Sequence, residues 1–156
     1  MNPKEILKKS SLFREFNSLE LLKLTEICRR RFLPKGGVVI SEGEDFDTDS
    51  SLYIVVTGFA KVAVPMGEGK ELVLAFMSPA DHFGEMSFLD QHPRSADVVA
   101  MEDTELLVME QGALEELLAG DRDMAVKFYR SMSKVLAKRL RESNARMSGK
   151  RVDTGR

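Results

Sequence analysis

Between residues 31 and 110, the apolar residues fall in six short runs that are separated by turns rich in glycine, proline or acidic residues. The runs are VVI (38–40), LYIVV (52–56), AKVAV (60–64), ELVLAF (71–76), ADVVA (96–100) and ELLVM (105–109). Short segments of Val, Ile and Leu at regular spacing are typical of strands in a compact antiparallel sandwich or barrel. The sequence therefore predicts a mainly β region here.

Helical patterns flank this region on both sides. Asn2, Pro3 and Glu5 have the arrangement of a capped helix start, and apolar residues then recur at helical spacing. Residues 1–30 are therefore expected to form an N-terminal helical segment. Residues 111–147 return to helical spacing, whereas residues 148–156 are expected to be a disordered tail.

The predicted long C-terminal helix has a wide apolar stripe. Its apolar residues are three or four positions apart on two adjacent faces: Ala125, Phe128, Met132 and Val135 on one, and Leu136, Leu140 and Met147 on the other. One interpretation is that the stripe packs on the β region of its own chain. The other is a coiled-coil-like dimer seam, and both can hold for different turns.

The composition limits the classes of protein. A chain of 156 residues fits one domain, and a net charge of −2 argues against a uniformly basic nucleic-acid binder. The single cysteine, Cys28, excludes a disulfide framework within the chain, and two histidines are too few for a His-rich metal site. No apolar run approaches the roughly 20 residues of a membrane span, and the N-terminus has no apolar signal core. The default expectation is a cytoplasmic domain that binds neither metal nor membrane.

The charge is unevenly spread along the chain. Residues 127–156 contain ten Lys or Arg and two Asp or Glu, a net charge of +8. The simpler interpretation is a long helix with a solvated basic face. The alternative is a tail that binds nucleic acid, whose affinity would then fall steeply with salt.

The most informative segment is FGEMSFLDQHPRSADV, residues 83–98. Gly84 permits an unusual backbone conformation, and Glu85 offers a carboxylate that accepts hydrogen bonds from sugar hydroxyls. Ten positions after Gly84, Arg94 offers a fork of donors suited to two phosphate oxygens, and Ser95 adds a hydroxyl. Each residue alone has a plain structural explanation, such as a turn, a cap or a surface charge. Their combination predicts a site for a phosphate next to a sugar hydroxyl.

This segment resembles the phosphate-binding cassette of cyclic nucleotide-binding domains, through FGEMSFLD and PRSADVVA. The resemblance extends over roughly residues 10–140. It implies a double-stranded β-helix, a jelly-roll-like β-roll, over residues 31–110 with the cassette at 83–98. N-terminal helices precede this core, and the helices of residues 111–147 would supply a lid and a dimer contact.

The resemblance also implies a role for each matching residue in the phosphate site. Arg94 and Ser95 would hold the cyclic phosphate, together with backbone N–H groups around Met86 and Ser87. All four residues belong to the cassette.

The sugar and the base would meet other residues. Glu85 would bind the ribose 2′-hydroxyl, Gly84 would allow close approach, and Leu74 would be an apolar contact to the base. Ala96 completes the expected ligand-binding set. The long helix would close over the base through a residue between positions 128 and 140.

Two residues depart from the family pattern. Ala80 stands where glycine is common, which we expect to alter a turn more than the site. Asp97 follows Ala96 where Thr or a similar residue is frequent. It is either an outward-facing strand carboxylate or a group that recognises a guanine edge or disfavours a second phosphate.

These features predict a non-enzymatic regulatory module that binds a cyclic nucleotide, with cyclic AMP favoured over cyclic GMP. It would form a homodimer through the C-terminal helix and signal to a separate protein. Only nine residues follow Met147, so no DNA-binding domain is expected in this chain. The alternative is a nucleotide-free interaction module that keeps the same fold.

Overall fold

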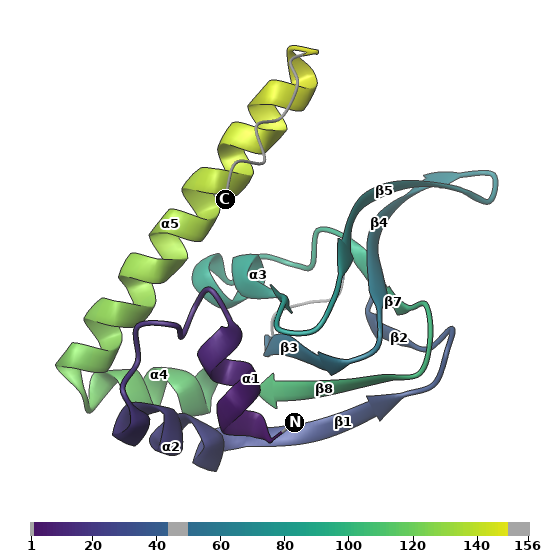
Figure 1. Ribbon diagram of the computed structural model, residues 1–156. Coiled ribbons are helices and arrows are strands. Elements are labelled where there is room, and N and C mark those ends of the chain that lie inside the picture. The colour runs from purple at the N-terminus through teal and green to yellow at the C-terminus, as the bar shows by residue number, and fades with distance from the viewer. Residues whose placement is uncertain (1, 44–49, 150–156) are drawn as a thin grey trace.

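The computed structural model describes residues 2–43 and 50–149, and these ranges form a mainly β domain with helices at both ends (Figure 1). The elements, in chain order, are α1 (Pro3–Lys9), α2 (Ser18–Ile27), β1 (Cys28–Leu33), β2 (Val38–Ile40), β3 (Leu52–Thr57), β4 (Ala60–Gly67), β5 (Lys70–Met77), β6 (His82–Phe83), α3 (Glu85–Asp90), β7 (Asp97–Ala100), β8 (Thr104–Met109), α4 (Gln111–Ala119) and α5 (Arg122–Met147). The strands form two four-stranded sheets, ordered β1-β8-β3-β6 and β2-β7-β4-β5, with antiparallel pairing. The expected fold class is confirmed.

All six runs that were predicted as strands are strands, and the structure adds β1 and β6. The helical segment at the N-terminus ends at Ile27 and not at residue 30. From Cys28 to Leu33 the chain pairs residue by residue with β8. Residues 28–30 were expected to be helical, but their pairing with β8 makes them a strand, because tertiary context commonly overrides local preference.

In the central strands, residues 52–56 of β3 and residues 106–109 of β8 are apolar without interruption because both faces of these stretches are buried. Along β3, Leu52, Ile54 and Val56 face the core beneath the helices, whereas Tyr53 and Val55 face the core between the two sheets. Side chains alternate across a strand, so a strand covered on both sides needs apolar residues at every position. The continuous runs in the sequence therefore mark the middle of the roll.

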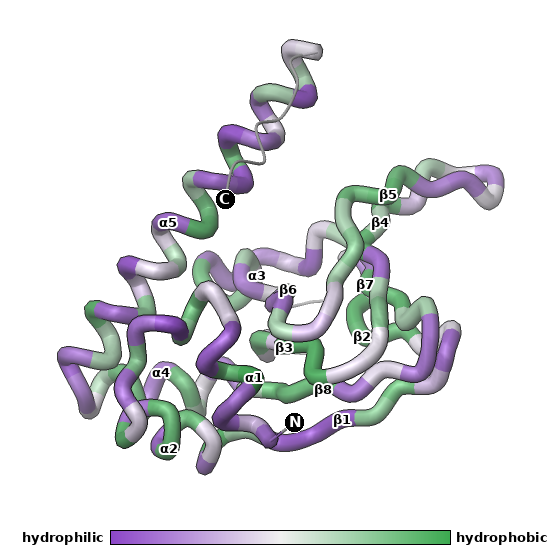
Figure 2. The backbone as a smooth tube through the Cα atoms, viewed as in Figure 1, coloured by the Kyte–Doolittle hydropathy of each residue, from purple (hydrophilic) through white to green (hydrophobic). Residues whose placement is uncertain are grey.

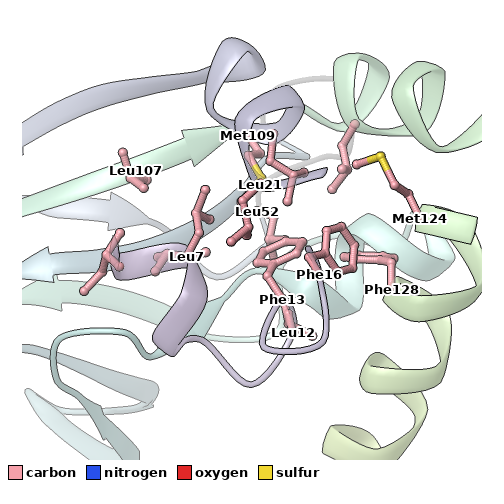
Figure 3. Packing of buried hydrophobic residues seen from close by; sticks show 14 of the residues in the cluster. Leu7, Leu12, Phe13, Phe16, Leu21, Leu52, Leu107, Met109, Met124 and Phe128 are labelled. Atoms are coloured by element: carbon pink, nitrogen blue, oxygen red, sulfur yellow. The ribbon is translucent and has the colours of Figure 1, made fainter. Parts of the chain in front are cut away.

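The first half of α5 packs on the domain itself. Phe128 and Met132 are buried in the core beneath the helices. Figure 3 shows Phe128 beside Phe13 and Phe16 in this core. A salt bridge between Lys127 and Glu20 ties α5 to α2. For these turns the apolar stripe covers the chain's own core.

The second half of α5 is different. Beyond the core, α5 continues away from α1, α2 and α4 (Figure 1), and Leu140 and Met147 are 62% and 84% exposed. Figure 2 shows mainly hydrophilic turns there with apolar positions between them. The helix ends at Met147 with Ser148 as its C-cap, and residues 150–156 of the expected tail lie outside the described residues.

The departure at Ala80 falls in a turn, as expected. The N–H of Asp81 donates to the carbonyl of Ser78 at 2.9 Å, and Ala80 has a φ of 76°. With Pro79 before it, Ala80 occupies the position of a type II turn that favours glycine, because a Cβ is strained at positive φ.

Replacing Ala80 by glycine should therefore raise the free energy of unfolding by about 0.5–1 kcal/mol, since the removed strain exceeds the added chain entropy. Chemical denaturation of the wild type and Ala80→Gly measures this difference. Ala137→Gly, an exposed position within α5, is the control and should lower stability by about 1 kcal/mol. A loss of stability in Ala80→Gly would contradict the assignment of strain to this turn.

Candidate functional site

A cavity of about 320 Å³ lies between the cassette, the sheet that contains β5, and α5. Its size falls at the lower end of the range of small-molecule sites. All eight residues predicted to bind the ligand line it: Leu74, Gly84, Glu85, Met86, Ser87, Arg94, Ser95 and Ala96. The structure thus brings the whole predicted set to one place, while their role in binding stays a prediction.

Arg94 lies at the cassette end of the cavity with only 5% of its surface exposed. Its Nη1 donates to the carbonyl of Gly84 at 2.9 Å, and its Nη2 donates to the carbonyl of Ser51 at 3.0 Å. Both acceptors are backbone carbonyl oxygens, and these bonds orient the guanidinium. A buried cation of fixed orientation is well suited to hold an anion.

Gly84 makes this arrangement possible. It has a φ of 90°, and a Cβ built there would lie 2.8 Å from the carbonyl oxygen of Ser51 and 3.0 Å from Nη1 of Arg94. The side chain of any other residue at this position would displace the Ser51 carbonyl, just before β3, and the guanidinium of Arg94. The glycine that the sequence pattern singled out is therefore required by close approach as well as by its φ.

Glu85, directly after Gly84, is 3% exposed and forms an ion pair with Arg139 of α5. Arg139 also reaches the carbonyl of His82, at 3.4 Å from its Nη2. Burial lowers the pKa of Arg139, whereas the negative charges of Asp81 and Glu142 raise it. The carboxylate expected to meet a ribose hydroxyl is thus already engaged by the long helix.

His82 also lies next to the Glu85 carboxylate. The distance from Nδ1 of His82 to Oε2 of Glu85 is 3.6 Å. Burial lowers the pKa of His82 to about 3, with a further contribution from the positive charge of Arg139. The imidazole is therefore neutral near pH 7. Arg139 is accordingly the cation that balances Glu85 in this arrangement.

The sequence analysis missed most of the α5 contribution to the cavity. Arg139 lies within the expected range of 128–140, but Glu142 and Arg146 lie beyond it and also line the cavity. Nη1 of Arg146 is 3.5 Å from the carbonyl oxygen of Leu74 on β5. The three residues follow one another at intervals of three and four, so they share one helix face. That spacing was the available signal.

Apolar side chains form the walls away from the cassette. They come from β2, β4, β5 and β7, and include Ile40, Val62, Leu74, Ala75, Met77 and Val98. Asp97, in contrast, accepts a hydrogen bond from the backbone N–H of Glu42 at 2.6 Å and is absent from the lining. This geometry is consistent with the structural interpretation of Asp97.

Two kinds of site are not found in the part of the chain that the structure describes. No group of three or more His, Cys, Asp or Glu residues there is arranged to hold a metal ion. None of the helices within the described ranges is long and apolar enough to cross a bilayer.

Comparison with known proteins assigns the chain to a family. Residues 30–121 match the family model of the cyclic nucleotide-binding domain. The cyclic AMP receptor protein of Thermus thermophilus is 35% identical over 138 residues, which are 88% of this chain and 61% of that protein. The CRP-like cAMP-activated global transcriptional regulator of Mycobacterium tuberculosis is 31% identical over 140 residues, covering 90% of this chain and 59% of the regulator. The chain therefore spans about three-fifths of the length of these relatives.

Solved structures agree with this assignment. The catabolite activator protein of Thermus thermophilus superposes with a TM-score of 0.78 at 31% identity, over 89% of this chain and 62% of that one. A cyclic nucleotide-binding domain from Methylobacillus flagellatus superposes with a TM-score of 0.80 at 28% identity, over 97% of this chain and 83% of the other. The β-roll, the cassette and the matching family model together show that this chain belongs to the cyclic nucleotide-binding domain family.

Proposed function

We propose that this chain is a non-enzymatic regulatory module that binds a cyclic nucleotide, with cyclic AMP favoured over cyclic GMP. Ligand binding would be signalled to a partner protein through a change in α5. The observation that carries the proposal is the pair of opposite charges at one cavity. Arg94 and Glu85 are each at least nine-tenths buried, and both line the same space. A cyclic phosphate would lie on Arg94 and Ser95, and the ribose would face Glu85.

Among the described residues, the charged side chains that line the cavity are Arg94, Arg139, Arg146, Glu85 and Glu142. A cyclic nucleotide carries one negative charge on its phosphate, and arginine side chains are well suited to bind it.

The apolar walls suit a purine base. Leu74, Val62 and Val98 face the cavity away from the cassette, where stacking and burial of a flat base would add to the affinity. Hydrogen bonds to a charged group contribute about 1.5–3 kcal/mol each, and micromolar affinity needs about 8 kcal/mol. Phosphate, ribose and base contacts are therefore all required. The names of the relatives that specify cyclic AMP support this nucleotide.

The ion pair between Glu85 and Arg139 would link ligand binding to α5. A ribose hydroxyl that binds Glu85 would compete with Arg139 of α5 for the same carboxylate. Binding would therefore change the contacts that hold the second half of α5 on the domain. A ligand shifts a conformational equilibrium only through different contacts in the two states, and this exchange is such a difference.

One face of α5 supports a homodimer as the output. Tyr129, Ser133, Leu136, Leu140, Ser143 and Met147 recur at alternating intervals of four and three, and of these Leu136 also packs against the core beneath the helices. Such a repeat forms the seam of a coiled coil. Tyr129, Leu140 and Met147 are 44%, 62% and 84% exposed, so they are open to a second helix. A separate downstream protein would then recognise the state of the dimer.

Replacing Arg94 by alanine should lower the affinity for cyclic AMP by at least a hundredfold, because two charge-assisted hydrogen bonds to phosphate are lost. Isothermal titration calorimetry of both proteins measures the change. Arg94→Lys keeps the charge without the fork and should bind with intermediate affinity. Arg29→Ala, an exposed arginine on β1, is the control and should bind like the wild type. Equal binding by wild type and Arg94→Ala would refute the assignment, and no binding by the wild type would favour a nucleotide-free interaction module.

Replacing Leu140 by glutamate should shift a dimer to a monomer, because the seam would then bury a carboxylate at its centre. Sedimentation velocity of the wild type and Leu140→Glu measures this change. Lys138→Glu, an exposed position off the seam, controls for added negative charge on the same helix. The proposed dimer contact would be contradicted if the wild type were monomeric at all concentrations, or if Leu140→Glu remained a dimer like the wild type.

A further inference from the structure

The carboxylate of Glu85 has a different neighbour at each of its two oxygens. Oε1 pairs with the guanidinium of Arg139, which reaches it from α5. Oε2 lies 3.6 Å from Nδ1 of His82, and the side chains of both residues are only 4% exposed. The contact with Arg139 would be lost if a ribose hydroxyl took its place. The contact with His82 comes from β6, so it does not depend on α5.

His82 approaches Glu85 from the side away from the cavity. In the pairing of β6 with β3, His82 lies opposite Ile54 and Phe83 lies opposite Tyr53. Phe83 lines the cavity, and because side chains alternate along a strand, His82 lies on the other face, with Ile54. His82 is accordingly absent from the cavity lining. It can therefore influence a ligand in the cavity only through Glu85.

Nδ1 of His82 is buried and, within residues 2–43 and 50–149, has no hydrogen-bond partner. Its distance of 3.6 Å from Oε2 of Glu85 is too long for a hydrogen bond, but a shift of roughly 0.6 Å would make one. Burial is the main cause of the low pKa of His82, so the ring is neutral near pH 7 and carries its proton on one nitrogen. The carboxylate beside Nδ1 favours the proton on that nitrogen, because two acceptors that face each other repel.

Glu85 would need a second donor once Arg139 has been displaced. A buried carboxylate that loses its counter-charge is destabilised, and one ribose hydroxyl supplies only one hydrogen bond in return. A donor at Oε2 would compensate for part of this loss and would keep Oε1 directed at the cavity. Since a carboxylate accepts at both oxygens, the two bonds can exist together.

We propose that His82 is a positioning residue, whose neutral imidazole donates a hydrogen bond from Nδ1 to Oε2 of Glu85 when a ribose hydroxyl binds Oε1. This inference rests on the proposed function and extends it from the residues that line the cavity to one behind them. The preference for a ligand with a 2′-hydroxyl then depends on His82 as well as on Glu85.

Two amide substitutions test which ring nitrogen matters. Asparagine places its amide nitrogen near the position of Nδ1, whereas glutamine places it near the position of Nε2. Wild type, His82→Asn and His82→Gln would each be titrated calorimetrically with cyclic AMP and with its 2′-deoxy analogue. His82→Gln should bind cyclic AMP about tenfold more weakly than the wild type and the analogue equally well, because only the ribose contact is weakened. His82→Asn should keep most of the preference for cyclic AMP, whereas a merely structural role would weaken both ligands alike.

A second measurement uses the wild type, so it does not depend on how the variants fold. Nitrogen NMR of protein with isotopically labelled histidine shows which ring nitrogen carries the proton. The chain has two histidines, and because the side chain of His92 is 78% exposed, the spectrum of His92→Gln assigns the signals of His82. We expect the Nδ1–H tautomer in the complex. Its proton resonance should move downfield when cyclic AMP is added, and less when the 2′-deoxy analogue is added.

The outcomes separate this inference from the proposed function. The inference is overturned, while the proposed function stands, if the proton is on Nε2 in the complex with cyclic AMP. The same holds if His82→Gln prefers cyclic AMP as strongly as the wild type, or if both variants lose affinity equally for the two ligands. If the wild type binds both ligands equally well, the ribose contact of Glu85 fails and this inference fails with it. If the wild type binds neither, the proposed function itself fails.

Discussion

The arrangement of the site depends on two opposite charges that are buried at one cavity, the guanidinium of Arg94 and the carboxylate of Glu85. Removing such groups from water costs several kcal/mol per ion unless hydrogen bonds and counter-charges compensate. Carbonyls of Gly84 and Ser51 orient the cation, and Arg139 balances the anion. The β-roll holds these partners in place, and Gly84 permits the close approach that the geometry needs. This arrangement supports the proposal that the cavity binds an anionic ligand.

The two halves of α5 are held by different physical means. The first half is anchored by burial of Phe128 and Met132 in the core and by the salt bridge from Lys127 to Glu20. The second half reaches the domain through polar contacts of Arg139 and Arg146. Segments with few buried apolar contacts open at low free-energy cost. The part of α5 next to the cavity is therefore held less firmly than the first half, and it carries most of the seam proposed for the dimer.

The sequence alone predicted the strands that carry the core and the cassette because their signals are local. Runs such as LYIVV and ELLVM mark strands buried on both faces, and the order Gly84, Glu85, Arg94, Ser95 falls within one short segment. Strand β1 was missed because its partner residues on β8 lie 71 to 81 positions away, and that pairing makes Cys28–Leu33 extended. Glu142 and Arg146 were missed for a related reason. The rotation of α5 about its axis is set by how Phe128 packs on the core, and an amphipathic pattern does not fix which residues then face a cavity.

The most direct test of the account asks whether Glu85 meets the sugar of a nucleotide that Arg94 holds by its phosphate. Wild type and Glu85→Ala would each be titrated calorimetrically with cyclic AMP and with its 2′-deoxy analogue. The account predicts that the wild type binds cyclic AMP about tenfold or more tightly than the analogue, and that Glu85→Ala binds both with equal, weaker affinity. Equal affinity of the wild type for the two ligands, or an undiminished preference in Glu85→Ala, would contradict the convergence of these two charges on one ligand.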